Sequence, residues 1–200
     1  ALLATPEGPL PADGTVSDLP PLDGPGGLER WSQDVRLAVL TWELGECLSF
    51  EKSPPPNTAQ LQWNAQPLVT IERPSMNVLR QQAQATFDAS HGLMAAGNHE
   101  KRMSEILTQI TPPIAYWSSV IALHPDRTPK TLELIHLALM LGTSVVLRFK
   151  HALACPRPFE VNARCMPHIL TPAHSALPSG HATESSSASM LLAHLLSSDS

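Results

Sequence analysis

The sequence predicts an all-α fold preceded by an extended N-terminal arm, and three observations lead to this prediction. Apolar residues recur at spacings of three and four over most of the chain after residue 27, which is the period of a helix with one buried face. Prolines and polar capping residues mark the ends of several of these segments. The length of 200 residues suits a single domain, for which we expect about five or six helices.

The predicted arm comprises residues 1–27. It holds six of the twenty prolines and five of the ten glycines and shows neither a helical nor an alternating period. Such a segment is typical of a linker or of a chain that lies along a surface. We expect residues 28–200 to form one helical domain that is incomplete at its C-terminus, for a reason given below.

The first helix is predicted over residues 28–48, where Trp31 and Trp42 are expected to be anchors of the core or of an interface. A homo-oligomer is compatible with these tryptophans but is not required by them. Prolines 54–56 end the region. Residues 60–71 contain a short apolar patch, which leaves open a strand or an extended crossing segment.

Four more helices are expected further along the chain. A proline or glycine follows the first two, and a His-Pro-Asp turn follows the third. The fourth begins at Thr128–Pro129, a favourable helix start, and reaches Ala152 or Ala154. The predicted ranges are 76–96, 100–110, 114–123 and 128–154.

This fourth helix is apolar almost all round between Leu134 and Leu147, which predicts a central, buried position. The apolar run is too short to cross a bilayer, so we expect a soluble protein with no membrane span. The sequence leaves the compartment open, a periplasmic or secreted location included.

The net charge of the chain and its distribution limit the classes of function that we expect. The formal net charge of −5 argues against a nucleic-acid partner and against a protein that binds membrane surfaces. Four of the thirteen basic residues nevertheless fall between positions 148 and 164. Such a cluster indicates either a focused anion site or a solvated helix face. The three cysteines do not form a disulfide framework; a Cys155–Cys165 bridge and three buried thiols both remain open.

The tetrapeptide Pro178-Ser179-Gly180-His181 comes directly before a segment, 182–196, that reads as a helix. Ser179 is a candidate N-cap. A helix start offers unpaired N–H groups and a positive dipole end, and the glycine lets the backbone approach an anion closely. We therefore predict a site for a tetrahedral oxyanion such as phosphate or vanadate.

Lys150 and Arg157 are the predicted cationic partners of this anion. They are seven residues, or two helical turns, apart, so both heads can reach one point. Lysine supplies a compact charge and arginine a planar fork that binds two oxygens. The alternative is that Lys150 extends into solvent and Arg157 pairs with Glu160.

The order Lys150-x6-Arg157-Pro158, nineteen residues, and then Pro-Ser-Gly-His resembles the first two motifs of the type 2 phosphatidic acid phosphatase and vanadium-dependent haloperoxidase superfamily. The match covers residues 150–181. The resemblance implies a helical bundle of the acid phosphatase and vanadium haloperoxidase type, whose site holds phosphate or vanadate.

The resemblance also implies roles. Lys150 and Arg157 would bind equatorial oxygens, the Ser179 hydroxyl and the Gly180 N–H would each bind one oxygen, and His181 would be the catalytic acid–base residue. Histidine suits that role because its proton moves near neutral pH. A further residue, His174, is a candidate to line the pocket or to cap the loop.

The superfamily's third motif, an arginine followed by a histidine, is missing from these residues. No arginine or lysine follows Arg164, and His194 is the only histidine after the tetrapeptide. We expect the direct vanadium-ligand histidine beyond residue 200, in a longer protein or a second chain. Zinc is disfavoured because the cysteine and histidine spacing fits no zinc pattern and the cationic pair would repel the ion.

Three functions follow from this reading. The first is a vanadium-dependent haloperoxidase-like enzyme, with vanadate as cofactor and with hydrogen peroxide and a halide as substrates. The second is a phosphatase that hydrolyses phosphate esters in the same pocket. The third is a non-catalytic helical protein that binds an oxyanion.

Overall fold

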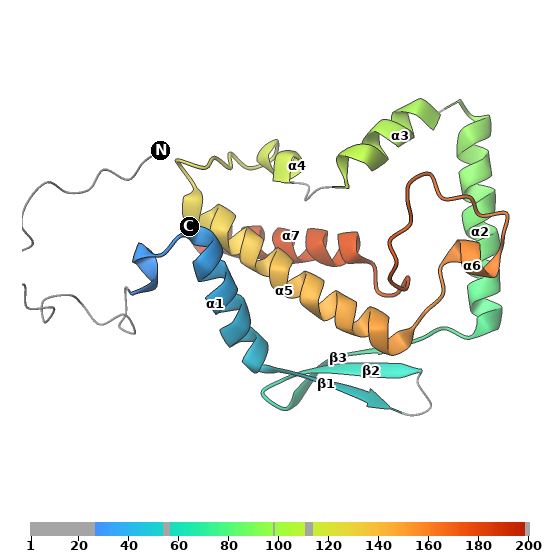
Figure 1. Cartoon of the computed structure of the whole chain (residues 1–200). Coiled ribbons are helices and arrows are strands. Elements are labelled where there is room, and N and C mark those ends of the chain that lie inside the picture. Colours follow the sequence, from blue (N-terminus) through green and yellow to red (C-terminus); the bar gives the residue numbers. More distant parts are fainter. Residues whose placement is uncertain (1–26, 54–56, 98, 111–113, 199–200) are drawn as a thin grey trace, which may run out of the picture.

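The computed structural model describes residues 27–53, 57–97, 99–110 and 114–198 (Figure 1). Apart from Gly27, the predicted arm of residues 1–27 lies outside this part of the chain. A short 3-10 turn at Leu28–Arg30 leads into the regular elements. These are α1 (Gln33–Glu46), β1 (Leu48–Ser53), β2 (Thr58–Trp63), β3 (Gln66–Glu72), α2 (Met76–Ala95), α3 (His99–Thr108), α4 (Ile114–Ser118), α5 (Pro129–Leu153), α6 (Pro158–Val161) and α7 (Gly180–Ser198).

The prediction of an all-α helical bundle is wrong, because the chain also forms a three-stranded antiparallel sheet with the order β1-β2-β3. β1 was missed because it follows α1 after a single residue, so its first position was included in the predicted helix. Its alternation of Leu48 and Phe50 with polar neighbours is a weak signal over so few residues. The middle strand β2 shows the same alternation, with Ala59 and Leu61 buried on one face.

The turn between β2 and β3 consists of two residues with positive φ, Asn64 at 48° and Ala65 at 61°. A two-residue hairpin of this kind requires left-handed backbone at both positions, and Asn-Gly is the usual sequence. Alanine in place of glycine hides the hairpin from a reading of the sequence.

α5 is the element against which α1, the sheet and α7 pack. The C-terminal half of α5 supplies Phe149, Ala152 and Leu153 to a core cluster with Ala59 and Leu61 of β2. The ring of Phe149 also meets the Phe50 ring edge-on, with 4.9 Å between centroids. The sheet therefore covers the C-terminal end of α5, as Figure 1 shows.

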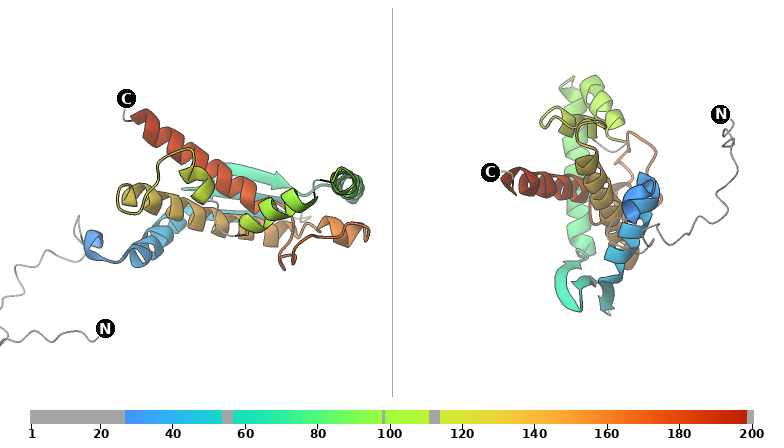
Figure 2. Two further views of the ribbon diagram at one scale, coloured as in Figure 1. Left: turned by 90° about the horizontal axis from the view of Figure 1, so that it is seen from above. Right: turned by 90° about the vertical axis from the view of Figure 1, so that its left-hand side faces the viewer.

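The N-terminal half of α5 builds a second cluster. Its Ile135 and Leu139 are buried against Leu192 of α7, and Trp117 and Ile121, in and just after α4, pack on the outside. α7 packs against α5, and its C-terminal end projects away from the rest of the molecule (Figure 2). α5 thus separates two apolar clusters, one at each of its halves.

The predicted start of α5 is confirmed, because the helix begins at Pro129 with Thr128 as its N-cap residue. Burial all round is not observed, since Leu134, Met140 and Leu147 are each 40–42% exposed. By length and composition the stretch Pro129–Val161 is apolar enough to cross a membrane, with a mean hydropathy of 1.6 and 28% of its window buried. The absence of a membrane span therefore stays a prediction.

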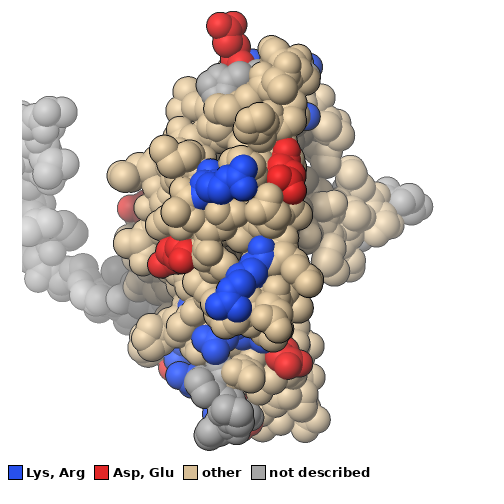
Figure 3. Space-filling view, turned by 90° about the vertical axis from the view of Figure 1, so that its right-hand side faces the viewer, with Lys and Arg blue, Asp and Glu red and all other residues tan. Residues whose placement is uncertain are grey.

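α1 is fastened to α5 by a two-pronged ion pair, in which Arg36 Nε and Nη2 donate to the two carboxylate oxygens of Glu133 at 2.6 and 2.9 Å. Because Glu133 is only 7% exposed, this paired contact is a position-specific link between the helices. On the other side, α2 packs against α6 and carries α3 away from the sheet (Figure 1). Basic and acidic side chains are scattered over this side, without a continuous patch of either sign (Figure 3).

The hairpin turn yields a stability prediction. Left-handed backbone costs a non-glycine residue about 1–2 kcal/mol, whereas glycine pays mainly unfolded-state entropy of about 0.5–1 kcal/mol. We therefore expect Ala65→Gly to raise the free energy of unfolding by about 0.5–1 kcal/mol, measured by urea denaturation. The matched control is Ala85→Gly on the exposed face of α2, which should lower stability by about 1 kcal/mol. Equal losses in both variants would contradict this account of the turn.

Candidate functional site

Lys150 lies in the last turn of α5 and is only 5% exposed. Its ammonium donates to two carbonyl oxygens of the loop before α7, those of Ser175 at 3.0 Å and Ala176 at 3.4 Å. The Ser175 hydroxyl in turn donates to the Lys150 carbonyl. The alternative in which Lys150 extends into solvent is therefore excluded.

Arg157 follows the end of α5 and lies close to Lys150. Its Nε donates to the His174 carbonyl at 2.9 Å, and its Nη2 lies 3.1 Å from His174 Nδ1. Nδ1 would accept in this bond because a guanidinium only donates, but it would have to donate to the Ser175 carbonyl oxygen, which lies 3.2 Å away. Glu160 caps the Arg157 backbone N–H at 2.6 Å and makes no ion pair with the guanidinium among the described contacts. The alternative of an Arg157–Glu160 ion pair is therefore not observed.

The loop that both cations hold, residues 174–178, leads directly into the tetrapeptide. It is fixed at further points: the Ala176 N–H donates to the Cys155 carbonyl at 2.9 Å, and Leu177 packs against the cluster around Phe149. These contacts fasten one short loop to the end of α5 and to the residues just after it. The structure therefore brings the predicted basic pair onto the loop that leads into α7.

α7 begins at Gly180, and Ser179 occupies the capping position. The Ser179 hydroxyl accepts from the Ala182 N–H at 3.3 Å, and the Ser179 carbonyl accepts from Thr183 N–H at 3.2 Å. The predicted N-cap is confirmed. The N–H groups of Gly180 and His181 have no acceptor among the described residues, so they are the donors a helix start offers to an anion.

His181 lies on the first turn of α7 and is exposed. Its Nε2 is 2.8 Å from the carbonyl oxygen of Gln109, just after α3. A carbonyl only accepts, so Nε2 must carry a proton, and in the neutral ring Nδ1 is left as the base. His174 is also exposed, and it touches Arg157 rather than the interior of a cavity.

The electrostatics of Lys150 set this site apart. Burial lowers its pKa below the ordinary lysine value of 10.5, and the neighbouring positive charge of Arg157 lowers it further. No carboxylate of the described chain lies within ion-pair distance of either cation. A buried cation beside a second cation is unfavourable unless an anion meets the pair.

The hydrogen-bond donors of this site suit an oxyanion rather than a metal ion. The Lys150 ammonium has three N–H bonds, and the described partners accept two of them. Arg157 Nη1 has no acceptor among the described residues and adds further N–H donors. Within the described ranges, no three His, Cys, Asp or Glu side chains are grouped to hold a metal ion. Burial raises the pKa of the Cys155 thiol, which keeps it neutral and unreactive.

Sequence reasoning missed two parts of this region. One is the set of loop carbonyls that hold the cations, because backbone acceptors carry no residue signature. The other is Gln109, whose carbonyl orients His181 across 72 positions of sequence.

The three cysteines are all free thiols (Cys47, Cys155 and Cys165). The Cys155–Cys165 bridge is therefore not formed.

Comparison with protein-family models, with curated proteins and with solved structures gives no match for this chain. The superfamily resemblance therefore rests on the residues of the two sequence motifs and stays a prediction.

Lys150 gives a prediction on pH dependence. Because the fold lowers its pKa, the unfolded chain binds more protons at this group between the folded pKa and 10.5, so stability rises with pH across that interval. We expect the unfolding free energy of the native chain, minus that of Lys150→Met, to increase as pH rises toward 10.5. Urea denaturation at several alkaline pH values measures this difference.

The control for this experiment is Lys101→Met, which removes one exposed positive charge from α3. It corrects for the general effect of net charge at each pH. A difference for Lys150→Met that falls with rising pH would show that burial of Lys150 does not disfavour its charge.

Proposed function

We propose that this chain binds a tetrahedral oxyanion at the start of α7 and works as a vanadium-dependent haloperoxidase-like enzyme. One observation supports the proposal most: Lys150 is buried next to Arg157, with no carboxylate among the described residues to balance either charge. An oxyanion that meets both heads removes this imbalance. The free N–H groups at the start of α7 add uncharged donors on the same loop.

Vanadate fits this set of donors because it is an oxyanion with the shape and charge of phosphate. The buried ammonium with an N–H left over would bind one oxygen, and the guanidinium of Arg157 would bind others. When bound, vanadate supplies the centre at which hydrogen peroxide becomes able to oxidise a halide.

His181 is the proposed acid–base residue. Its Nε2 proton is held by the Gln109 carbonyl, so Nδ1 is the atom that takes up or delivers a proton. Exposure of the ring allows exchange of that proton with solvent. Ser179 has a separate role, since its hydroxyl oxygen accepts a bond from the backbone and its proton remains available for an oxyanion oxygen.

The test measures oxyanion binding by the complete gene product, because the resemblance places the third motif downstream. Orthovanadate and inorganic phosphate are titrated by calorimetry against the native protein, Lys150→Met and Arg157→Gln. Since a hydrogen bond to a charged group contributes about 1.5–3 kcal/mol, each substitution should weaken binding roughly 10- to 100-fold. Arg80→Gln is the control: it removes an exposed arginine from α2, whose described side-chain bond goes only to Asn77.

Turnover separates the three functions. Bromination of a phenol dye in the presence of vanadate, bromide and peroxide supports the proposal. Hydrolysis of a phosphate ester without bromination replaces it with the phosphatase, and binding without either reaction leaves a non-catalytic oxyanion-binding protein. No binding of either anion at millimolar concentration would refute the site itself.

A further inference from the structure

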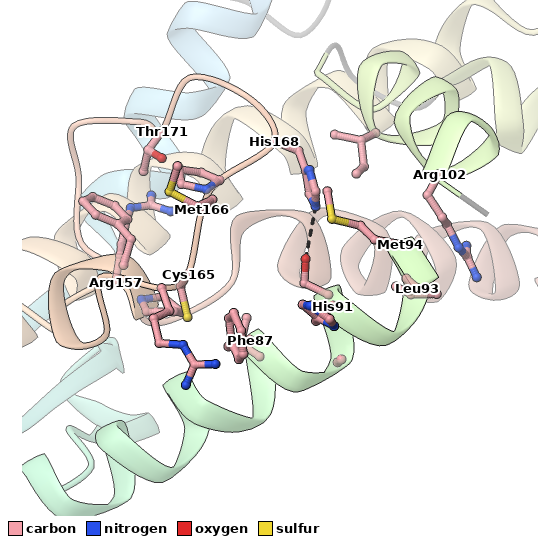
Figure 4. A pocket seen from close by; sticks show the side chains of 18 of the residues that line it. Phe87, His91, Leu93, Met94, Arg102, Arg157, Cys165, Met166, His168 and Thr171 are labelled. Carbon is pink, nitrogen blue, oxygen red and sulfur yellow. Dashed lines mark hydrogen bonds between the residues drawn. The ribbon is translucent and has the colours of Figure 1, made fainter. Parts of the chain in front are cut away.

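A cavity of about 810 Å³ lies beside the oxyanion site, between α2, α3 and the chain from α6 to residue 171. That volume falls within the range of pockets that enclose small organic molecules, about 300–1,000 Å³. Figure 4 shows α2 along one side and the loop with Cys165, Met166 and His168 along the other. Of the residues given a role in the proposed function, only Arg157 lines this space.

The walls of the cavity are mainly apolar. Aromatic and thioether side chains from three segments face it, and methionine sulfur and flexible methionine side chains adapt to ring-shaped ligands. Only Ser90, Thr86 and Thr171 bring hydroxyl groups. The apolar lining includes Phe87, Met94, Met103, Ile106, Phe159 and Met166.

All ionisable side chains that can bear a charge on this lining at neutral pH are basic. Three arginines and two histidines line the cavity, and no aspartate or glutamate is among the described lining residues. The Arg102 guanidinium is engaged by Glu105 at 2.6 Å, whereas the Arg164 guanidinium lies 4.0 Å from the centre of the Phe87 ring without a described carboxylate partner. Charge complementarity therefore favours an anionic ligand.

Arg157 connects the cavity to the oxyanion site. It lines the cavity, and its Nε is bound to the His174 carbonyl of the loop before α7. Arg157 and Arg102 lie at opposite ends of the cavity in Figure 4. A ligand with its anionic end at Arg157 would extend its apolar body along α2, toward α3.

We propose that this cavity binds a ring-containing organic anion, with the anionic group at Arg157 and the rings between α2 and the loop of residues 162–171. This inference deepens the proposed function and rests on it in one respect: the cavity would hold the organic substrate next to the oxyanion. The cavity and its basic lining are themselves independent of vanadate.

The experiment uses two fluorescent probes with the same rings. 8-Anilinonaphthalene-1-sulfonate carries an anionic group, and N-phenyl-1-naphthylamine is its uncharged counterpart. We expect the sulfonate to bind the native protein at least tenfold more tightly, which corresponds to about 1.4 kcal/mol. Equal affinities would overturn the assignment of an anion site.

Met94→Glu tests the position of the rings. Met94 lies on α2, is 48% exposed and lines the cavity, so a carboxylate there should repel the sulfonate without disturbing the core. Binding of the sulfonate should fall at least tenfold. Met190→Glu on α7, where the methionine is 75% exposed and outside the cavity lining, is the matched control. Similar losses in the two variants would place the probe elsewhere, and urea unfolding confirms that both variants fold.

Orthovanadate titrations of the same variants keep the two proposals apart. Met94→Glu should leave orthovanadate binding unchanged, and Lys150→Met should weaken orthovanadate while the uncharged probe still binds. If sulfonate binding passes its tests and orthovanadate does not bind, the proposed function fails and the cavity assignment stands. If orthovanadate binds but the two probes do not differ, the cavity assignment fails alone.

Discussion

The buried charge of Lys150 is the constraint on which the site depends. Placing an ammonium group at the end of an apolar helix carries a desolvation cost, and the adjacent Arg157 adds repulsion rather than relief. Backbone carbonyls of Ser175 and Ala176 recover part of that cost, and they do so only because the loop before α7 is drawn onto the end of α5. The same contacts that solvate the cation therefore hold the loop before the tetrapeptide at the end of α5.

α5 connects the site around Lys150 to the rest of the fold. The sheet packs against its C-terminal half and α7 against its N-terminal half, so the site lies at the end of the helix that the sheet covers. The sheet is the element that an all-helical scheme lacks. It buries Phe149 immediately before Lys150 and also Ala152 and Leu153 after it, which leaves this turn of α5 little freedom to carry the ammonium into water.

Arg157 divides its contacts between two regions with different chemistry. Toward the loop it meets carbonyl and imidazole acceptors, and toward α2 it borders a mainly apolar cavity whose other charged groups are also basic. The proposed oxyanion site and the cavity are thus adjacent through one side chain. The arrangement suits chemistry in which an oxyanion and an organic molecule must lie within reach of each other.

The sequence alone determined the local features whose signals lie within a few residues: the start of α5 at Thr128–Pro129, the cap at Ser179 and the spacing that brings Lys150 and Arg157 to one loop. The tertiary structure decided what depends on distant partners: the sheet, the Gln109 carbonyl at His181 and the cavity beside α2. The sequence does not indicate β1, because its pairing partners are backbone groups of another segment. It does not indicate the hairpin of β2 and β3 either, because the Asn64–Ala65 turn lacks the expected glycine. Helix ends and motif spacings are encoded by neighbouring residues, whereas sheets and cavities arise from surfaces that meet only when the chain has folded.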